Sequence, residues 1–172
     1  FVAVADCTGH GVPGAFMSMI GESLLDDIVN EKEIYEPALM LEMLNFGIRT
    51  GLKQEETDND DGMDVSLCCI TPNNDGSYTI EFSGAKRPLY YIREGKIEIL
   101  KGDSKEIGGY LRKKEKEFTT QNIRLYKDDM LFLTSDGYAD QSNKKLKKLG
   151  SGLLLDMLEM HQKHPLEKQK KL

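Results

Sequence analysis

Two aspartates each stand at the end of an apolar run, where the chain enters a polar turn that contains glycine. Asp6 follows Val-Ala-Val-Ala, and Asp136 follows Leu-Phe-Leu-Thr-Ser and precedes a glycine. Carboxylates held at strand ends could converge on a hard divalent cation, because Mg²⁺ and Mn²⁺ prefer oxygen ligands. A lone aspartate at such a place is more often a turn former or a helix cap. The repeated construction adds modest support for a metal site at Asp6 and Asp136.

Asp64 is a further candidate ligand for the same cation. It directly precedes a predicted buried strand, so a capping role at the strand start explains it about equally well. The acidic stretch around it does not fit a calcium loop. If Gly62 is placed at loop position 6, Thr57 and Cys68 fall at positions that require acidic residues. Residues 58–61 are therefore interpreted as a solvated acidic loop.

Three other residues could take part in phosphoryl chemistry. His10 lies in a glycine-rich turn and could protonate a leaving group or bind a phosphoryl oxygen, or it could be an ordinary turn residue. Arg87 lies between two predicted strands, where a guanidinium could hold phosphate bidentately, although most exposed arginines do not. Cys7 follows Asp6, but the arginine of a cysteine-phosphatase loop is absent, so its backbone carbonyl is the more useful group.

The turn over residues 9–14 also matches the pattern G-x-G-x-x-G between a strand and a helix, which raises a dinucleotide site as a hypothesis. A dinucleotide-binding fold needs a second parallel strand after the first helix, whereas a second helix is predicted here. A P-loop is excluded because alanine and phenylalanine follow Gly14 in place of Lys and Ser or Thr. Nucleotide binding thus ranks third among the hypotheses, and calorimetry with a dinucleotide would test it.

The elements that position these residues follow from hydrophobic periodicity. A buried strand is predicted over residues 1–5, a helix with Pro13 in its first turn that runs to about residue 30, and a second helix over residues 37–52. Short β-rich runs separated by turn signals then indicate antiparallel hairpins. These runs cover residues 65–71, 78–83, 89–93, 97–101, 118–126 and 130–135. A last helix is predicted over residues 143–161. This order is typical of a layered α+β domain.

Composition limits the class of protein. A chain of 172 residues with 39% hydrophobic and 30% charged side chains is expected to fold as one globular domain. A net charge of −6 argues against a nucleic-acid binder, and the apolar runs are too short for a membrane span. Three cysteines without a C-x-x-C pair indicate neither a disulfide framework nor a zinc site, so a reducing cytoplasm is the expected location.

Four sequence blocks, in order and over residues 1 to about 160, resemble the stage II sporulation protein E type of serine phosphatase, a branch of the PPM-type metal-dependent phosphatases. The blocks are DCTGHGVPGAFMSM (residues 6–19), DGMDV (61–65), GAKRPLY (84–90) and SDGYADQ (135–141). Each block alone is weak evidence for the family, but the occurrence of all four in this order is specific for it.

The resemblance implies an α-β-β-α sandwich of two antiparallel sheets flanked by helices, with two or more Mn²⁺ or Mg²⁺ ions at one edge. It implies hydrolysis of phosphoserine or phosphothreonine on a protein by an activated water, without a covalent protein intermediate. In the family, the aspartate that opens the glycine-rich turn bridges metals, the next residue offers its backbone carbonyl, and the aspartate of the later Asp-Gly is another ligand. These positions correspond to Asp6, Cys7 and Asp136, with Asp6 and Asp136 as the catalytic pair.

A further acidic ligand from an Asp-Asp segment and an upstream strand, both common in the family, are not found within the 172 residues. We therefore expect a single phosphatase domain over residues 1–172, truncated at both ends. The expected setting is bacterial signal transduction in the cytoplasm, with an upstream sensor domain that could tether the full-length protein to a membrane. The expected partner is a phosphorylated protein such as an anti-sigma-factor antagonist. The domain itself is expected to contact neither nucleic acid nor membrane. The alternative is a catalytically weak or inactive phosphatase-fold interaction module.

Overall fold

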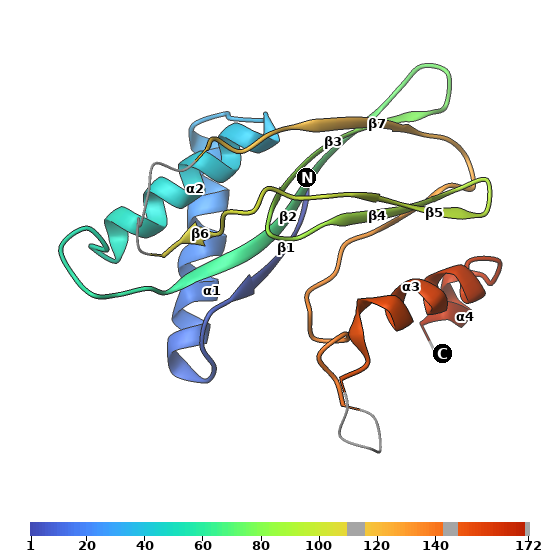
Figure 1. The fold of residues 1–172 in the computed structure, drawn as a ribbon. Helices are drawn as coiled ribbons and strands as arrows, with labels where there is room; N and C mark the ends of the chain where they lie inside the picture. The colour runs from blue at the N-terminus through green and yellow to red at the C-terminus, as the bar shows by residue number, and fades with distance from the viewer. Residues whose placement is uncertain (110–115, 143–147, 171–172) are drawn as a thin grey trace.

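Two antiparallel sheets form the centre of the molecule in the computed structural model, which describes residues 1–109, 116–142 and 148–170 (Figure 1). The first sheet has the strand order β1-β2-β3-β7, with the short β6 also paired to β2, and the second has the order β5-β4-β8. The strands of the first sheet are β1 (Val2–Cys7), β2 (Gly62–Pro72), β3 (Tyr78–Ala85), β6 (Ile107–Gly108) and β7 (Gln121–Leu125). Those of the second are β4 (Leu89–Arg93), β5 (Lys96–Leu100) and β8 (Met130–Phe132).

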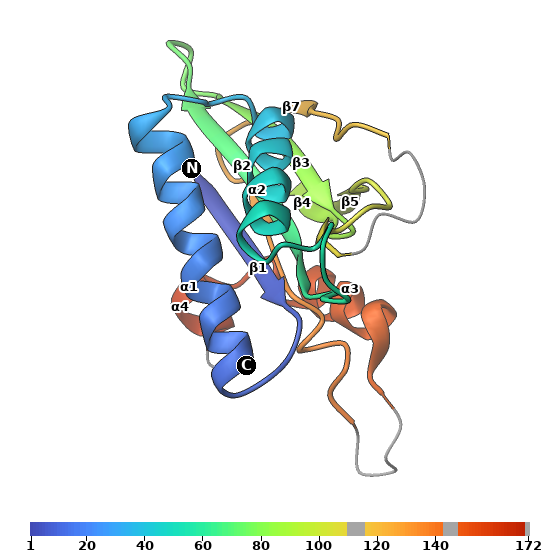
Figure 2. The same cartoon turned by 90° about the vertical axis from the view of Figure 1, so that its left-hand side faces the viewer.

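Helices flank the sheets on both sides. α1 (Val12–Asp26), which continues into the π-helical turn η1 (Asp27–Glu31), and α2 (Pro37–Gly51) cover one face of the first sheet (Figure 2). α3 (Gly150–His161) lies against β5 of the second sheet and is followed by the short α4 (Leu166–Gln169). The predicted α-β-β-α sandwich is confirmed. No helix within the described ranges combines the length and the hydropathy that a membrane crossing requires.

Two hydrophobic cores separate these layers. The core between the helices and the first sheet contains Leu41 and Leu44 of α2 and Leu67 of β2, all essentially inaccessible to solvent. The core between the two sheets contains Cys68 of β2 and Phe82 of β3. Neighbouring residues of a strand point to opposite faces, so the first part of β2, up to Cys68, is largely buried on both sides, whereas its end from Ile70 is exposed. Burial raises the pKa of the Cys68 thiol to about 12, so this cysteine is a core residue whose thiol stays protonated at neutral pH.

β2 begins earlier than the sequence predicts, and this difference matters for Asp64. Met63 pairs with Ile107 of β6, which extends the strand back to Gly62. Asp64 consequently lies inside β2 and not ahead of it, directly opposite Asp6 of β1 in the antiparallel register. Because Asp64 and Cys68 are four residues apart in one strand, they share its inner face, which is turned toward the second sheet.

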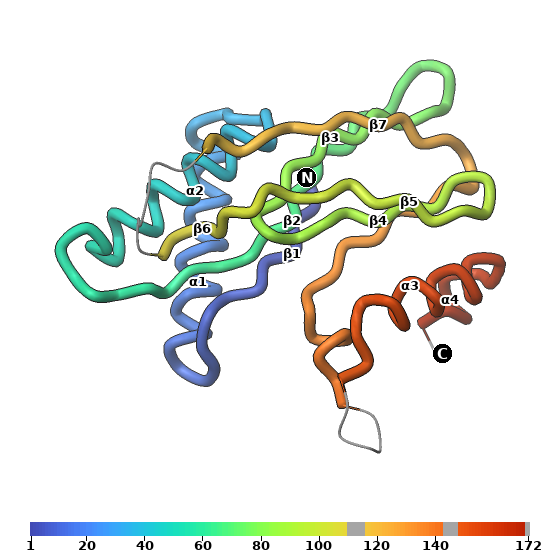
Figure 3. The backbone as a smooth tube through the Cα atoms, viewed as in Figure 1, coloured from blue at the N-terminus to red at the C-terminus, as the bar shows by residue number. Residues whose placement is uncertain are grey.

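Other boundaries differ for local reasons. The strand predicted over residues 118–126 is shorter, because its first residues bind α2 instead: Ala38 donates its N–H to Thr120 Oγ1 at 3.0 Å. β8 ends at Phe132, so the chain reaches Asp136 as a loop before it turns to α3 (Figure 3). Residues 143–147 of the predicted last helix lie outside the described residues, and α3 begins at Gly150. The strand β6 and the helix α4 were not predicted.

The loop between β3 and β4, which carries Arg87, rests in a slot formed by two glycines. A Cβ added to Gly84 would lie 2.2 Å from the Arg87 carbonyl oxygen, and one added to Gly102 would lie 2.5 Å from it. Asp103 ties this slot together, since its N–H donates to the Gly84 carbonyl and its carbonyl accepts from Lys86 N–H. Glycine at these positions permits the close approach that fixes the backbone of Arg87.

Replacement of Gly84 by alanine is expected to destabilise the domain by about 1 to 3 kcal/mol, because the new methyl group would overlap a backbone atom. Urea unfolding measures this change. The matched control is Gly51→Ala at the end of α2, where an added Cβ meets nothing within 4 Å and helix propensity predicts no loss or a gain of up to about 1 kcal/mol. Equal unfolding midpoints for the two variants would contradict the claim that the Arg87 backbone leaves no space for a side chain at residue 84.

Candidate metal centre

Three carboxylates from three separate segments converge on one nitrogen atom. Arg87 Nη2 lies 2.8 Å from Asp6 Oδ2, 2.7 Å from Asp136 Oδ2 and 3.3 Å from Asp64 Oδ2. Asp6 lies near the end of β1, Asp64 lies opposite it in β2, and Asp136 lies in the loop after β8. We refer to Asp6, Asp64 and Asp136 as the carboxylate cluster. The structure thus brings together four of the six residues that the sequence singled out.

The turn that follows Asp6 is fastened to the start of β2. Thr8 donates its backbone N–H to the Gly62 carbonyl at 2.9 Å, and Gly62 N–H donates to Thr8 Oγ1 at 2.9 Å. The Thr8 hydroxyl also lies 3.1 Å from Asp61 Oδ1. Sequence analysis missed Thr8 and Asp61 as supports of the cluster, and the only signal was a hydroxyl residue within a turn. Their bonds hold Asp6 beside Asp64.

The carboxylate cluster runs from half-buried to open. The side chain of Asp64 is 25% exposed, that of Asp6 is 32% exposed, and that of Asp136 is 50% exposed. Asp136 is held by a local turn, in which Asp140 donates its N–H to the Asp136 carbonyl at 2.8 Å. The two strand-borne aspartates therefore form the floor of the site, and the loop-borne one forms its rim.

Charge is incompletely balanced in the cluster. Burial, together with the neighbouring Asp136 carboxyl, raises the pKa of Asp6. Burial also raises the pKa of Asp64, although Arg87 opposes this effect. The hydrogen bond from Arg87 lowers the pKa of Asp136. One guanidinium thus favours the ionised form of the rim carboxylate but supplies too little positive charge for all three.

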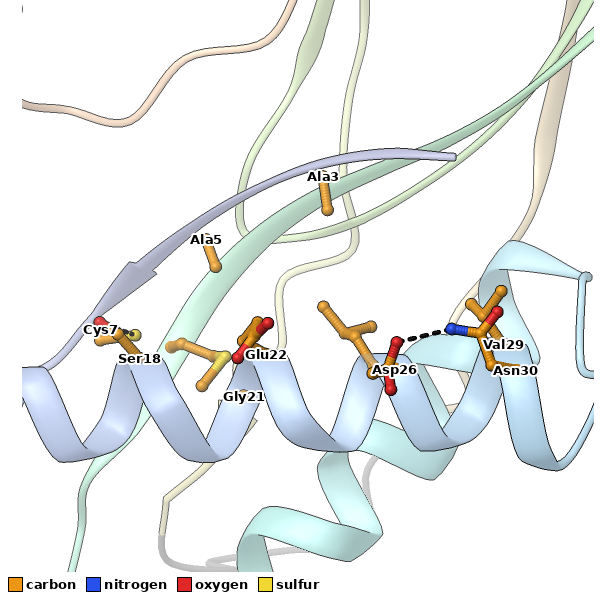
Figure 4. A pocket seen from close by; sticks show the side chains of 11 residues that line it. Ala3, Ala5, Cys7, Ser18, Gly21, Glu22, Asp26, Val29 and Asn30 are labelled. Atoms are coloured by element: carbon orange, nitrogen blue, oxygen red, sulfur yellow. Dashed lines mark hydrogen bonds between the residues drawn. The ribbon is translucent and has the colours of Figure 1, made fainter.

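Cys7 turns its side chain away from the cluster. Its Sγ lies 3.7 Å from Ser18 Oγ of α1 and lines a cavity of about 460 Å³ between β1 and α1, seen from close by in Figure 4. Because side chains alternate along β1, this face is opposite to that of Asp6. The thiol is therefore not in a position to attack a group bound at the cluster.

His10 is exposed in the glycine-rich turn and, within the described residues, is not among the groups in contact with Arg87 or the carboxylate cluster. The turn itself needs its glycines. Gly9 and Gly11 have φ values of 85° and 64°, and a Cβ on Gly14 would lie 2.9 Å from the Gly9 carbonyl oxygen. Pro13 lies in the first turn of α1, as predicted.

A second, smaller cavity of about 300 Å³ adjoins the rim of the cluster. It is lined by Asp136 and Arg87, by Tyr90 of β4 and by Lys148, whose Nζ lies 2.8 Å from Asp140 Oδ2. Two cationic side chains therefore stand beside the exposed end of the carboxylate cluster. Sequence analysis missed Lys148, because its place depends on a bridge between Lys148 and Ser142 that no sequence pattern indicates.

The donor chemistry of the cluster fits Mn²⁺ or Mg²⁺. Carboxylate oxygens are the ligands that these hard cations prefer, and here three of them already bind a cationic group. Among the residues that the structure describes, no group of three or more His, Cys, Asp or Glu side chains is arranged to hold a metal ion. At the carboxylate cluster, the Arg87 guanidinium fills the point where the three oxygens meet.

Comparison with known proteins agrees with this architecture. The family model of stage II sporulation protein E (SpoIIE) matches residues 1–172. The SiaA-PP2C domain of Pseudomonas aeruginosa is 28% identical with a TM-score of 0.78, over 98% of this chain and 64% of that one. No curated protein matched the sequence.

Two more distant structures share the fold. The PP2C phosphatase domain of SpoIIE from Bacillus subtilis is 18% identical with a TM-score of 0.60, and the match covers 94% of this chain and 49% of that chain. The structure of the RsbU and RsbW domains of Rv1364c from Mycobacterium tuberculosis is 16% identical with a TM-score of 0.67, and the match covers 97% of this chain and 44% of that chain. The chain thus spans less than two thirds of the length of each of these structures. By its sequence and its fold, it belongs to the SpoIIE family of PP2C-type phosphatase domains in bacterial signalling.

Proposed function

We propose that this chain is a metal-dependent protein phosphatase domain that hydrolyses phosphoserine or phosphothreonine on a protein. The observation that carries the proposal is the convergence of Asp6, Asp64 and Asp136 on a single cationic nitrogen. Carboxylates from three segments are costly to hold together without a compensating cation. Membership of the SpoIIE family supports a phosphatase over other metal-dependent activities.

In this proposal Asp6, Asp64 and Asp136 hold Mn²⁺ or Mg²⁺, with two or more ions in all and the backbone carbonyl of Cys7 as an added ligand. Bound ions would supply the positive charge that activates a water molecule and neutralises the developing charge on the phosphoryl group. Asp6 and Asp64 suit a rigid role because paired strands fix their separation. Asp136 suits the side that faces substrate, because it is the most exposed of the three.

The cavity at the rim supports the choice of substrate class. With a volume of about 300 Å³ the cavity can admit a phosphorylated side chain. Its wall also carries Lys148 and Tyr90, which can donate hydrogen bonds to phosphate oxygens. No role is proposed for the exposed His10. The cavity opens beside Asp136, so an entering phosphoryl group would meet the carboxylate cluster at its rim.

The biological setting extends the proposal. We place residues 1–172 in one phosphatase domain of a bacterial cytoplasmic signalling protein with a sensor domain upstream. A structure with RsbU and RsbW domains is among its structural neighbours. This supports a phosphorylated anti-sigma-factor antagonist as the protein substrate.

Hydrolysis of an aryl phosphate by the purified chain is expected only with Mn²⁺ or Mg²⁺ present, because hard carboxylate ligands select these ions. The measurement compares initial rates before and after exhaustive chelation and after metal is restored. Hydrolysis that survives chelation would overturn the metal mechanism. A properly folded chain with no turnover at any metal concentration would favour the phosphatase-fold interaction module instead.

Asp136→Asn is expected to reduce turnover to background while the fold stays intact. The amide is nearly isosteric with the carboxylate but carries no charge, so it weakens the cation site. Melting curves with and without Mn²⁺ should show a smaller metal-induced stabilisation than in the wild type. Asp58→Asn in the exposed acidic loop is the matched control and should behave as wild type. Full activity and full metal stabilisation in the Asp136 variant would make Asp136 a simple turn residue.

Cys7→Ser is expected to keep most of the activity, because only the backbone carbonyl of residue 7 belongs to the proposed site. The hydroxyl can still accept the contact from Ser18. Initial rates at saturating Mn²⁺ test this expectation. Activity at background level, in a variant with an unchanged melting curve, would instead support a thiol nucleophile.

A further inference from the structure

The Arg87 guanidinium occupies the place that a divalent cation would need. The atom Nη2 carries two hydrogens, so it can donate to Asp6 and Asp136 at 2.8 and 2.7 Å, and it attracts Asp64 at 3.3 Å by charge alone. Mg²⁺ bound to the same oxygens would need to approach them to about 2.0 to 2.1 Å. Nη2 and a metal ion cannot both lie between these three oxygens.

We infer that Arg87 is a built-in counterion of the carboxylate cluster, which competes with the divalent cation and must swing away when the metal binds. The inference deepens the proposed function and rests on it for the identity of the ion. It assigns to Arg87 a regulatory position: the side chain stabilises the metal-free domain and sets how tightly the metal is held.

The charges favour exchange over coexistence. Three carboxylates and one guanidinium leave the cluster with a net charge of about −2 when all are ionised, and a divalent ion cancels this charge better than a guanidinium does. With Arg87 in place, the metal must displace a charge-assisted pair of hydrogen bonds. The domain therefore stays folded without metal, at the cost of a lower metal affinity.

The attachment of Arg87 suits a side chain that moves while its backbone stays. The backbone is held in the slot of Gly84 and Gly102, and the following residue is Pro88. By contrast, Nε is buried and has no hydrogen-bond partner within the described residues. In the described part of the chain, the hydrogen bonds and ion pairs of this side chain all go through Nη2 to the cluster, so its rotation breaks no other polar contact there.

There is room for the displaced guanidinium. The cavity of about 300 Å³ at the rim is lined by Arg87 itself, together with Tyr90 and Lys148. A guanidinium that leaves the cluster can enter this cavity, where it would join Lys148 beside an incoming phosphoryl group. Metal binding would then move the Arg87 guanidinium from its place between the three carboxylates into the cavity.

Mn²⁺ titration by calorimetry tests the inference without any turnover. Arg87→Met removes the charge and keeps much of the volume, so the dissociation constant for Mn²⁺ is expected to fall by about ten- to a hundredfold. This is about the value of one hydrogen bond to a charged group, because solvent screens the partly exposed cluster. Arg87→Lys keeps the charge and should stay much closer to wild type. Arg124→Met, at a half-exposed arginine of β7 paired with Asp75, is the control and should leave the affinity unchanged.

The metal-free Arg87→Met protein should also melt at a lower temperature than wild type and gain more from added Mn²⁺. Mn²⁺ affinity that is unchanged or weaker in this variant would overturn the inference. If the variant does not fold, NMR of the wild type decides. The Arg87 Nε–H resonance is assigned as the one that disappears in Arg87→Lys. It should shift as Mg²⁺ is added, with the same midpoint as the heat of Mg²⁺ binding. A resonance that stays in place at saturating Mg²⁺ would overturn the exchange.

The two hypotheses fail in different ways. If Arg87→Met binds Mn²⁺ more tightly and wild type shows no phosphatase activity, the exchange holds and the proposed function is wrong. If wild type is an active phosphatase and Arg87→Met binds Mn²⁺ as wild type does, the proposed function holds and the exchange is wrong.

Discussion

The antiparallel pairing of β1 with β2 is the constraint on which the candidate site depends. It places Asp6 opposite Asp64, and two carboxylates at adjacent positions across a strand pair repel each other. The hydrogen-bonded ladder and the buried β2 hold them there against that repulsion. Thr8 and Gly62 complete the ladder with reciprocal hydrogen bonds, so the pair cannot separate without loss of the strand register.

Arg87 compensates for part of the negative charge of this enforced pair, whereas Asp136 adds to it. Arg87 brings positive charge from the loop between β3 and β4, which two glycines allow to approach. Asp136 arrives from the second sheet on a loop and adds a third negative charge at the exposed rim. The negative charge that remains after this compensation would favour binding of a further cation, and in this way the layered fold supports the metal-dependent activity that we propose.

Strand and helix existence could be predicted well from the sequence, because periodicities of 2 and 3.6 residues reflect local burial. The long helix pair before the hairpins and the end of β1 near Asp6 were visible in this way, whereas the strand predicted over residues 130–135 ends at Phe132, before Asp136. Boundaries were harder, as the start of β2 and of β7 show. Pairing with β6 lengthened the first, and bonds from residues 118–120 to α2 shortened the second. Both effects come from segments far apart in the chain.

By itself the sequence indicated Asp6 and Asp136 as candidate cation ligands, because each follows an apolar run and enters a polar turn, and the four ordered motifs indicated the SpoIIE family. Only the tertiary structure decided that Asp64 belongs with Asp6 and Asp136, that the Cys7 thiol faces α1, and that Arg87 lies among the carboxylates. The reason is physical. Strand register and loop approach are set by contacts between distant segments, and a side chain's electrostatic partners depend on that packing more than on its neighbours in sequence.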